Sequence, residues 1–305
     1  MKQNESKPPS WLVIGLYGAI SANLALVHHW LIDAPHRAEQ IAWYQAIIHG
    51  WGPAPDQYRI MTYGLAYLLI KIGLPFGIAF TLIRFVGLWI SGLLFARFLQ
   101  LWFSPWATLL GVLMLYASFP LTFLGYMMQP TDTLNLVFFL VSFLVIACEK
   151  DLWLFCLVPV AMLNRETPIL IPLALVAARW ETERWRGILW ASLLFLLAAS
   201  VFVGLRLVIG FRAPYTSLFK LWENLQSPWT YILPTILIGP YSLMATLHWS
   251  MKPPFLRRVF IVLLPAMLVV HMMVGLLAET RLLLPILPIA IALALFELIP
   301  ESRPG

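Results

Sequence analysis

The sequence has few charged residues and no long polar stretch. Only 11% of its 305 residues are Asp, Glu, Lys or Arg, whereas 61% are hydrophobic and the mean hydropathy is +0.84. Ordinary soluble domains are about 45–50% apolar and about 25% charged. This composition excludes a water-soluble globular domain, an intrinsically disordered chain and a collagen. Because no polar stretch is long enough for a separate soluble domain, we expect one integral membrane domain over residues 1–305.

Several chemical signatures are also missing from the sequence. Its two cysteines, Cys148 and Cys156, lie in apolar stretches, which favours buried free thiols over a disulfide scaffold. There is no GxGxxG turn, Walker loop, HExxH zinc motif or GxSxG serine elbow. The net charge of +6 is not gathered in a basic run interleaved with aromatics, so nucleic acid is not an expected partner. His28 and His29 point apart if they are helical, so we predict no metal site.

Long apolar runs are what the sequence has instead. A helix that crosses a membrane needs about 20 predominantly apolar residues. Eight runs approach this length, namely 11–30, 76–97, 106–125, 133–148, 187–207, 229–248, 259–278 and 282–299. Three shorter runs, at 60–74, 152–163 and 168–178, are typical of re-entrant or broken helices. The sequence therefore predicts an all-α, polytopic transmembrane bundle with about ten crossings and one re-entrant or interfacial half-helix.

Basic residues in short loops indicate the orientation of such a bundle, because cytoplasmic loops carry an excess of Lys and Arg. Basic residues occur at Arg97, at Lys150 and in the segments 179–186 and 252–258. Each of these places is separated from the next by an even number of expected crossings. We therefore expect all four on the cytoplasmic side of the membrane.

The first loop requires one adjustment to this topology. Lys2 and Lys7 favour a cytoplasmic N-terminus, which places the loop 31–59 outside. The next crossing begins outside only if the run 60–74 does not cross fully. Both termini are then cytoplasmic. Within the loop, apolar and polar residues around 38–49 predict a short amphipathic helix on the membrane surface.

Five segments fall on the predicted outer face, and four of them supply candidate site residues; the fifth is the loop 210–227. The candidates are Asp33, Glu39, Asp56 and Arg59 from the first loop, and Asp132, Arg165, Glu166, Glu279 and Arg281 from later loops. Charges at the membrane boundary are costly, so each is a functional hypothesis, and their convergence suggests one polar site. Structural interpretations stay open: Asp132 also suits a helix N-terminus, and Arg165–Glu166 also suits an ion pair that fixes a helical hairpin. Arg84 and Arg206 lie inside apolar runs, and we expect them to extend their charged ends to the interface.

The order of several short motifs resembles a known family. Asp33 follows the first helix, and later come three polar motifs: Gln57-Tyr58-Arg59, Gln129-Pro130-Thr131-Asp132 and Asn164-Arg165-Glu166-Thr167. Glu279-Thr280-Arg281 then precedes two prolines near the end. This pattern resembles the GT-C membrane glycosyltransferases, particularly small bacterial members related to the Arn-type and protein-mannosyltransferase superfamily. The chain differs from many members because it carries no soluble domain after its last helix.

The resemblance implies a GT-C-like fold and a multi-pass protein of the bacterial inner membrane. It implies transfer of a sugar from a polyprenyl-phosphate donor at the outer face of the membrane, with an essential acidic residue in the first outer loop. By position that residue is Asp33, with Glu39 as the alternative. Some relatives use a divalent cation, and the sequence leaves this open, along with the oligomeric state.

The expected chemistry divides the site residues into two groups. A carboxylate such as Asp33 or Glu39 would act as the general base that deprotonates an acceptor hydroxyl. Arginines would stabilise the leaving phosphate through bidentate contacts. We expect the substrate-binding residues to be Asp56, Tyr58, Arg59, Asp132, Arg165, Glu166, Glu279 and Arg281. A lipid or anion transporter is the alternative function, since broken helices around buried charges suit transport too. A non-catalytic membrane scaffold is a third.

Overall fold

The computed structural model describes residues 10–123 and 130–299, so Lys2, Lys7 and Gln129 lie outside the described residues. Every regular element in these two ranges is helical, and the one strand-like contact there is an isolated bridge between Ala54 and Pro214. The predicted all-α architecture is therefore confirmed for the described chain.

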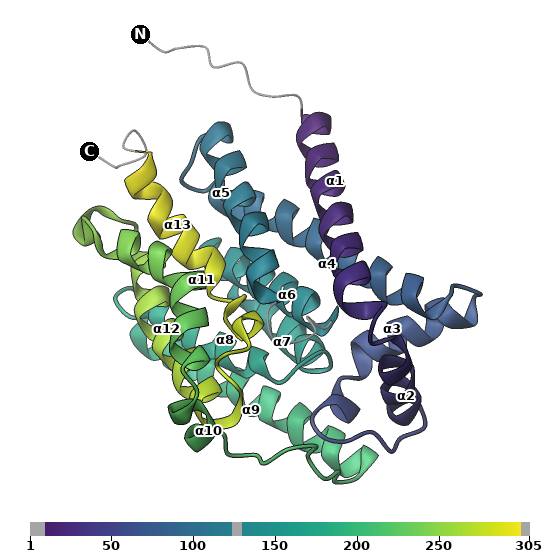
Figure 1. Cartoon of the computed structure of the whole chain (residues 1–305). Helices are drawn as coiled ribbons and strands as arrows, with labels where there is room; N and C mark the ends of the chain where they lie inside the picture. Colours follow the sequence, from purple (N-terminus) through teal and green to yellow (C-terminus); the bar gives the residue numbers. More distant parts are fainter. Residues whose placement is uncertain (1–9, 124–129, 300–305) are drawn as a thin grey trace.

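The helices pack side by side in one bundle (Figure 1). Thirteen α-helices are described: α1 (Ser10–His28), α2 (Arg37–Ile48), α3 (Ile60–Lys71), α4 (Phe76–Leu99), α5 (Pro105–Ser118), α6 (Pro130–Ala147), α7 (Leu154–Met162), α8 (Ile171–Arg179), α9 (Arg184–Ile209), α10 (Leu221–Gln226), α11 (Trp229–Thr246), α12 (Pro254–Val274) and α13 (Leu287–Leu298). Helix α1 continues into a π-helical turn over His29–Asp33.

Six of these helical segments are long and apolar enough to cross a membrane, which indicates a multi-pass membrane protein. They are Trp11–Asp33, Phe76–Leu99, Pro105–Thr122, Pro130–Ala147, Arg184–Ile209 and Pro254–Val274. Four further apolar helices are shorter, namely Ile60–Lys71, Asp151–Met162, Thr167–Arg179 and Leu287–Leu298. The three runs that we expected to be short are among them.

Two of the eight predicted full-length spans differ in the structure. The run 282–299 is divided: Thr280–Leu283 is a 3-10 turn and α13 starts only at Leu287, with Pro288 in its first turn. Proline at that position removes no intrahelical hydrogen bond, so it favours a helix start there. Helix α11 has 18 residues but contains Pro234 and Pro240, and it is not among the six long apolar segments.

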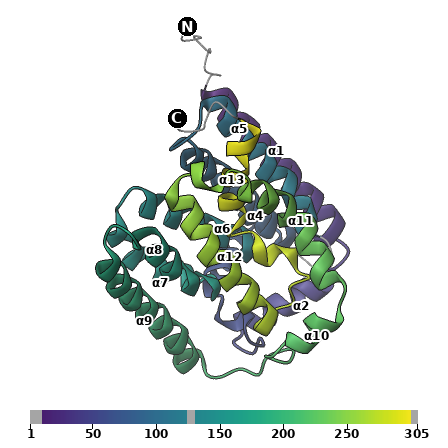
Figure 2. The ribbon, with the colours of Figure 1, turned by 90° about the vertical axis from the view of Figure 1, so that its left-hand side faces the viewer.

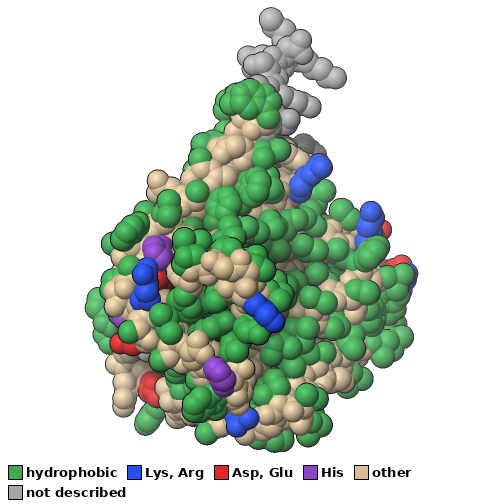
Figure 3. Space-filling view, turned by 90° about the vertical axis from the view of Figure 1, so that its right-hand side faces the viewer, with side chains coloured by type: hydrophobic (Ala, Val, Ile, Leu, Met, Phe, Trp, Pro, Cys, Tyr) green, Lys and Arg blue, Asp and Glu red, His purple; other side chains and the backbone are tan. Residues whose placement is uncertain are grey.

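The interior and the surface of the bundle are both apolar. Residues 287–296 of α13 are all buried, which fits a helix that is hydrophobic on every side. Helix α9 lies on the outside of the bundle (Figure 2), and Leu196, Val203 and Leu207 on it are exposed. The face in Figure 3 is mostly hydrophobic, with few charged side chains. Cys148 and Cys156 are exposed on this kind of surface, so the expectation that they are buried is wrong.

Helices α4 and α6 approach each other closely, and this contact positions the start of α6. A Cβ atom added at Gly87 would lie 2.5 Å from the Thr133 hydroxyl oxygen and 2.8 Å from its Cβ. Such distances are far below van der Waals contact, so only glycine fits there without movement. Because Thr133 follows Asp132 directly, Gly87 fixes where this carboxylate lies.

The predicted amphipathic helix of the first loop is present as α2. Its Tyr44 and Ile47 are buried in a small apolar cluster with Tyr63 of α3 and Phe80 of α4. Part of its apolar side therefore packs on the protein, while Ile41 is exposed. The loop 31–59 thus folds against the bundle.

Candidate functional site

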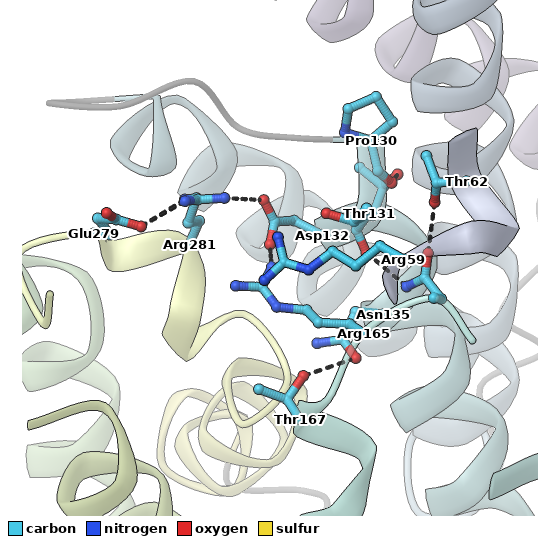
Figure 4. Close-up of polar contacts among 12 residues, drawn as sticks. Arg59, Thr62, Pro130, Thr131, Asp132, Asn135, Arg165, Thr167, Glu279 and Arg281 are labelled. Carbon is cyan, nitrogen blue, oxygen red and sulfur yellow. Dashed lines mark hydrogen bonds and ion pairs between the residues drawn. The ribbon is translucent and has the colours of Figure 1, made fainter. Parts of the chain in front are cut away.

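Asp132, near the start of α6, lies at the centre of a buried group of ions. One of its carboxylate oxygens contacts Nη1 of Arg165, and the other accepts a hydrogen bond of 2.9 Å from Nη1 of Arg281. Glu279 then accepts hydrogen bonds from Nε and Nη2 of Arg281 at 3.1 and 2.5 Å. Figure 4 shows Asp132 between the two guanidiniums. Three segments far apart in sequence meet at this point.

A second group of ions adjoins the first through consecutive residues of the α7–α8 connection, Arg165 and Glu166. Nε of Arg59 lies 3.5 Å from Oε2 of Glu166, and Nη1 of Arg59 contacts Asp56. The indole nitrogen of Trp43 donates a hydrogen bond of 3.0 Å to Asp56. We call the two groups together the arginine cluster, which comprises Asp56, Arg59, Asp132, Arg165, Glu166, Glu279 and Arg281.

Short helices and an asparagine hold the arginine cluster in place. The connection between α7 and α8 carries Asn164, whose side-chain amide donates to the backbone oxygen of Thr131 at 2.9 Å. The Asn164 side-chain oxygen accepts a hydrogen bond of 2.6 Å from Thr62 of α3. Asn164 therefore ties the connection to α3 and to the start of α6, which sets the positions of Arg165 and Asp132.

The three guanidiniums of the arginine cluster are buried and close enough to repel one another. Arg59, Arg165 and Arg281 are 7%, 5% and 6% exposed. Burial, followed by the charges of Arg59 and Arg281, lowers the pKa of Arg165 to about 9. Burial also acts to lower the pKa of Arg59, but the carboxylates of Asp56 and Glu166 outweigh it and raise that pKa. Arg165 is therefore the cation that would gain most from an added anion.

Tyr58, which we expected to bind substrate, contacts a different part of the chain. Its hydroxyl donates to the backbone oxygen of Gly210 at 3.0 Å and accepts from the backbone N–H of Arg212 at 2.9 Å. The guanidinium of Arg206 lies 4.2 Å from the centre of the Tyr58 ring. Tyr58 thus fastens the first loop to the end of α9. Arg206 is half-buried against this ring.

Asp33, the predicted base, belongs to a separate buried group. Its carboxylate accepts hydrogen bonds from Nη1 and Nη2 of Arg84 at 2.6 and 3.3 Å and from Gln40 at 3.0 Å. His28 and His29 lie 3.4 and 3.8 Å away. We call these five residues the Asp33 cluster. It joins α1, α2 and α4, and within the described residues Asp33 contacts neither Arg165 nor Arg281.

Two expectations about individual charges change with this geometry. Arg84 is 1% exposed and paired with Asp33, so the prediction that it extends to the interface is wrong. A lone arginine in an apolar helix needs a partner when it cannot reach water, and Asp33 supplies one. Glu39, the alternative base, is exposed in the first turn of α2. The structure thus brings together seven of the ten predicted site residues, the exceptions being Asp33, Glu39 and Tyr58.

Other residues of the site were not identified from the sequence. Trp43, Thr62, Asn135 and Asn164 all make polar contacts within or beside the arginine cluster, and Figure 4 labels Thr62 and Asn135. Asn164 belongs to the polar motif at 164–167. From that motif we predicted only the charged residues Arg165 and Glu166 as site residues. Thr62 and Asn135 lie inside apolar helices, where a polar side chain is a usable but weak signal.

The carboxylates of the arginine cluster do not fit a metal ion as they stand. Asp56, Asp132, Glu166 and Glu279 each lie within ion-pair distance of a guanidinium. Across the described residues, no group of three or more His, Cys, Asp or Glu side chains is placed to hold a metal.

Comparisons of the chain with protein families, with curated proteins and with solved structures find no match.

Proposed function

We propose that this protein is a membrane glycosyltransferase that moves a sugar from a polyprenyl-phosphate donor to an acceptor at the outer membrane face. The observation that supports this best is the convergence of three buried arginines, Arg59, Arg165 and Arg281, beside Asp132. Guanidiniums bind phosphate bidentately, and a buried set of them suits a phosphate that becomes a leaving group. The GT-C-like order of motifs points to the same chemistry.

The proposed topology places this site at the outer face. About ten crossings and two cytoplasmic termini follow from the basic loops, in a bacterial inner membrane. Three of the four basic segments gather at one end of the bundle. Lys150, Arg179 and Arg186 line the same pocket, and Arg258 pairs with Glu181. Because the arginine cluster is at the opposite ends of α6 and α8, a cytoplasmic basic end leaves the cluster facing outward.

Arg165 is the proposed first contact of the donor phosphate. Its pKa of about 9 keeps it cationic at neutral pH while its two neighbouring arginines repel it. A bound phosphodiester relieves that repulsion without removing Asp132. Arg59 and Arg281 complete the phosphate site from the two sides.

Glu166 is the carboxylate of the cluster that the contacts favour as the base. Its side chain is 27% exposed and its Oε2 is 3.5 Å from Arg59, while its Oε1 is buried and, within the described residues, has no hydrogen-bond partner. Asp56 and Asp132, by contrast, are almost wholly buried and held by guanidiniums. A carboxylate that is weakly paired and only partly buried accepts a proton more readily than one held by two guanidiniums.

The proposed reaction is a single displacement. The acceptor hydroxyl oxygen forms a bond to C1 of the sugar while the bond from C1 to the phosphate oxygen breaks. The hydroxyl proton passes to Glu166, and polyprenyl phosphate leaves with its charge held by the arginines. Asp33 and Glu39 stay predictions from the first loop, and the same assay compares all three carboxylates.

The test uses the full chain in nanodiscs, with labelled polyprenyl-phosphate sugars and a lipid extract as the source of acceptors. Consumption of one donor with formation of a glycosylated product is the expected result. A general base contributes about 10²–10⁴-fold, so Glu166→Gln should lower the rate by that factor with little change in donor binding. Arg97→Ala, at an exposed position away from the cluster, is the matched control. If no donor is consumed, the proposal is wrong.

Transport of a lipid or anion is the second candidate function. It is favoured by one observation: the arginine cluster lies where two short helices, α7 and α8, meet end to end, and broken helices of this kind line transport sites. The assay separates the two functions. A transporter would move a labelled lipid phosphate across a proteoliposome membrane and leave its sugar bond intact.

A further inference from the structure

A pocket of about 450 Å³ lies at the other end of the helices that carry the arginine cluster. It opens where α6 and α8 end and where α7 and α9 begin, and its lining includes Glu149, Lys150, Trp153, Arg179, Glu183 and Arg186. Asp132 lies near the start of α6 and the pocket at its end, so the rise of the helix separates them by about 23 Å. Pockets of roughly 300–1,000 Å³ hold small ligands and headgroups. This pocket is therefore a distinct site.

The floor of the pocket is an internally neutral ion pair. Nε and Nη2 of Arg179 donate to the two oxygens of Asp151 at 2.9 and 2.8 Å, and Nη2 also donates to the backbone oxygen of Ile146 at 2.9 Å. This bidentate pair rigidly closes the inner wall between α6 and α8. Because Arg179 and Asp151 bind each other, a ligand would contact mainly the charged side chains at the mouth of the pocket.

The mouth of the pocket offers both signs of charge. Lys150 is exposed, and no carboxylate among the described residues pairs with it. Arg186 donates from Nη1 to Glu183, and its guanidinium lies 4.8 Å from the centre of the Trp190 ring. Glu149 is 80% exposed and only 3.7 Å from Arg179. The exposed Lys150 and Glu149 therefore stand beside the Arg186–Glu183 ion pair, so both signs of charge are present at the rim.

Glu149 occupies a backbone conformation that normally belongs to glycine. Its φ is 57°, two residues after α6 ends at Ala147. The N–H groups of Glu149 and Lys150 bond back to Ile146 and Val145 at 3.1 and 2.9 Å, which closes the helix in a Schellman motif. A side chain is disfavoured in this left-handed region relative to glycine. A carboxylate kept there at the rim of a pocket suggests a role other than stability.

Exposed tryptophans occur in the pocket lining and beside it in the sequence. Trp153, which lines the pocket, is 65% exposed. Trp180 and Trp185, which adjoin the lining residues Arg179 and Arg186 in the sequence, are 46% and 78% exposed, and Arg184 lies 4.0 Å from the Trp180 ring centre. Exposed tryptophans with basic residues mark the level of the lipid headgroups in a membrane protein. A phospholipid is therefore the molecule with direct access to this pocket.

We propose that this pocket binds the phosphoethanolamine headgroup of a zwitterionic phospholipid, independently of the proposed transferase site. The phosphate contacts Lys150 and Arg186, and the primary ammonium contacts Glu149 and Glu183. The lining carries three cations and three carboxylates, so it complements a zwitterion better than an anionic headgroup. A primary ammonium also donates hydrogen bonds to carboxylates, which a choline group cannot do.

The test compares three kinds of nanodisc. One is pure phosphatidylcholine, and the other two contain about 20% of phosphatidylethanolamine or of the anionic phosphatidylglycerol. The readouts are the lipids retained by the purified full chain in native mass spectrometry and its Tm. Retention of phosphatidylethanolamine at least tenfold above both other lipids, with a raised Tm, is expected. Lys150→Ala should remove this selectivity, whereas Arg97→Ala, an exposed cation outside the pocket, should keep it.

Glu149→Gly sharpens the test because it should raise stability and at the same time remove lipid selectivity. Relief of the backbone cost should raise Tm in pure phosphatidylcholine by a few degrees. Loss of the carboxylate should remove the selectivity for phosphatidylethanolamine in the same variant. Equal or better retention of phosphatidylglycerol overturns the proposal, as does unchanged selectivity in Lys150→Ala. Competition by soluble glycerophosphoethanolamine at similar concentrations overturns the lipid as the source of the headgroup.

Discussion

Two buried carboxylates, Asp33 and Asp132, differ in the side chains that contact them. Asp33 meets one arginine, Arg84, and neutral or weakly basic donors, and its oxygens are occupied from three helices. Asp132 meets two arginines, with a third close enough to lower the pKa of Arg165. The first arrangement balances its charge and ties elements together. The second holds cations in mutual repulsion, which a bound anion would relieve.

The difference shows why burial of a charge does not by itself identify a binding site. Both clusters are largely buried, and buried ionisable residues in a membrane protein are candidates for a functional site in either case. A buried pair with one partner for each charge acts as a structural tie. In the arginine cluster only Asp132 contacts two guanidiniums, and this shared carboxylate leaves Arg165 and Arg281 with a preference for a further anion. The four predictions below act on this contrast.

The largest effect is expected from breaking the Asp33 cluster. Arg84→Met leaves the Asp33 carboxylate buried without its cation, which should lower the free energy of unfolding by about 3–5 kcal/mol. Thermal unfolding in detergent would measure the loss. The double variant Asp33→Leu with Arg84→Met removes both charges and should recover most of it. If the double variant is no more stable than the single one, Asp33 is not merely a structural tie.

A smaller effect is expected from Gly87, which lies between the two clusters. An alanine there would meet Thr133 and push the start of α6 away from α4. Overpacking of this kind typically costs about 1–3 kcal/mol. Because the shift moves Asp132, Gly87→Ala should also weaken donor binding. Gly64→Ala, where a Cβ meets no atom within 4 Å, is the control and should have neither effect.

Donor binding should depend on pH through Arg165. Its pKa of about 9 lies below the usual value, so it loses its proton as the pH rises through that point. The phosphodiester keeps its charge over this range, so KM for the donor should rise about tenfold per pH unit above pH 9, until the pKa of the complex is reached. Arg165→Ala should show a higher KM that is independent of pH between 8 and 10. A wild-type KM that is flat over this range would contradict the role of Arg165.

The smallest effect is expected at Glu39. Its side chain is exposed at the start of α2, and surface substitutions usually change stability by less than about 0.5 kcal/mol. Glu39→Gln should accordingly leave Tm within a degree or two of wild type. Its transfer rate tests Glu39 as the base. A rate near wild type removes Glu39 and leaves Glu166 and Asp33, whereas a loss of 100-fold or more would assign that role to Glu39, the alternative that the family resemblance gives.

The sequence indicated the polar segments better than it indicated their pairing. The motifs around Arg59, Asp132, Arg165 and Arg281 were chosen because charge beside an apolar run is costly, and the structure joins all four. The same reasoning placed Asp33 with them, although it lies with Arg84 instead. Which carboxylate meets which arginine depends on the rotation and depth of each helix. Neither quantity is encoded in the local pattern of residues.

The helices, like the charges, were predicted in part from the local sequence and in part depend on packing. Apolar length identified α4, α6, α9 and α12 as candidate spans because the hydrophobic requirement is local and additive along the chain. The run 282–299 was read as one span, yet its prolines and the Thr280–Leu283 turn leave only the short α13. That helix is nevertheless buried on every side, because its neighbours surround it. Only packing decides whether a short apolar helix lies at the centre or at the edge.

What the sequence alone determined was the all-helical character and the membrane class, because both follow from apolar content and from backbone groups that must be hydrogen-bonded within each segment. It also determined which short segments carry the charges. The tertiary structure decided that Arg59, Arg165 and Arg281 share one buried site while Asp33 is held elsewhere. It alone placed Glu149 and Lys150 at the rim of a pocket. These outcomes depend on contacts between residues up to 149 positions apart, such as Asp132 and Arg281, and no local rule specifies such contacts.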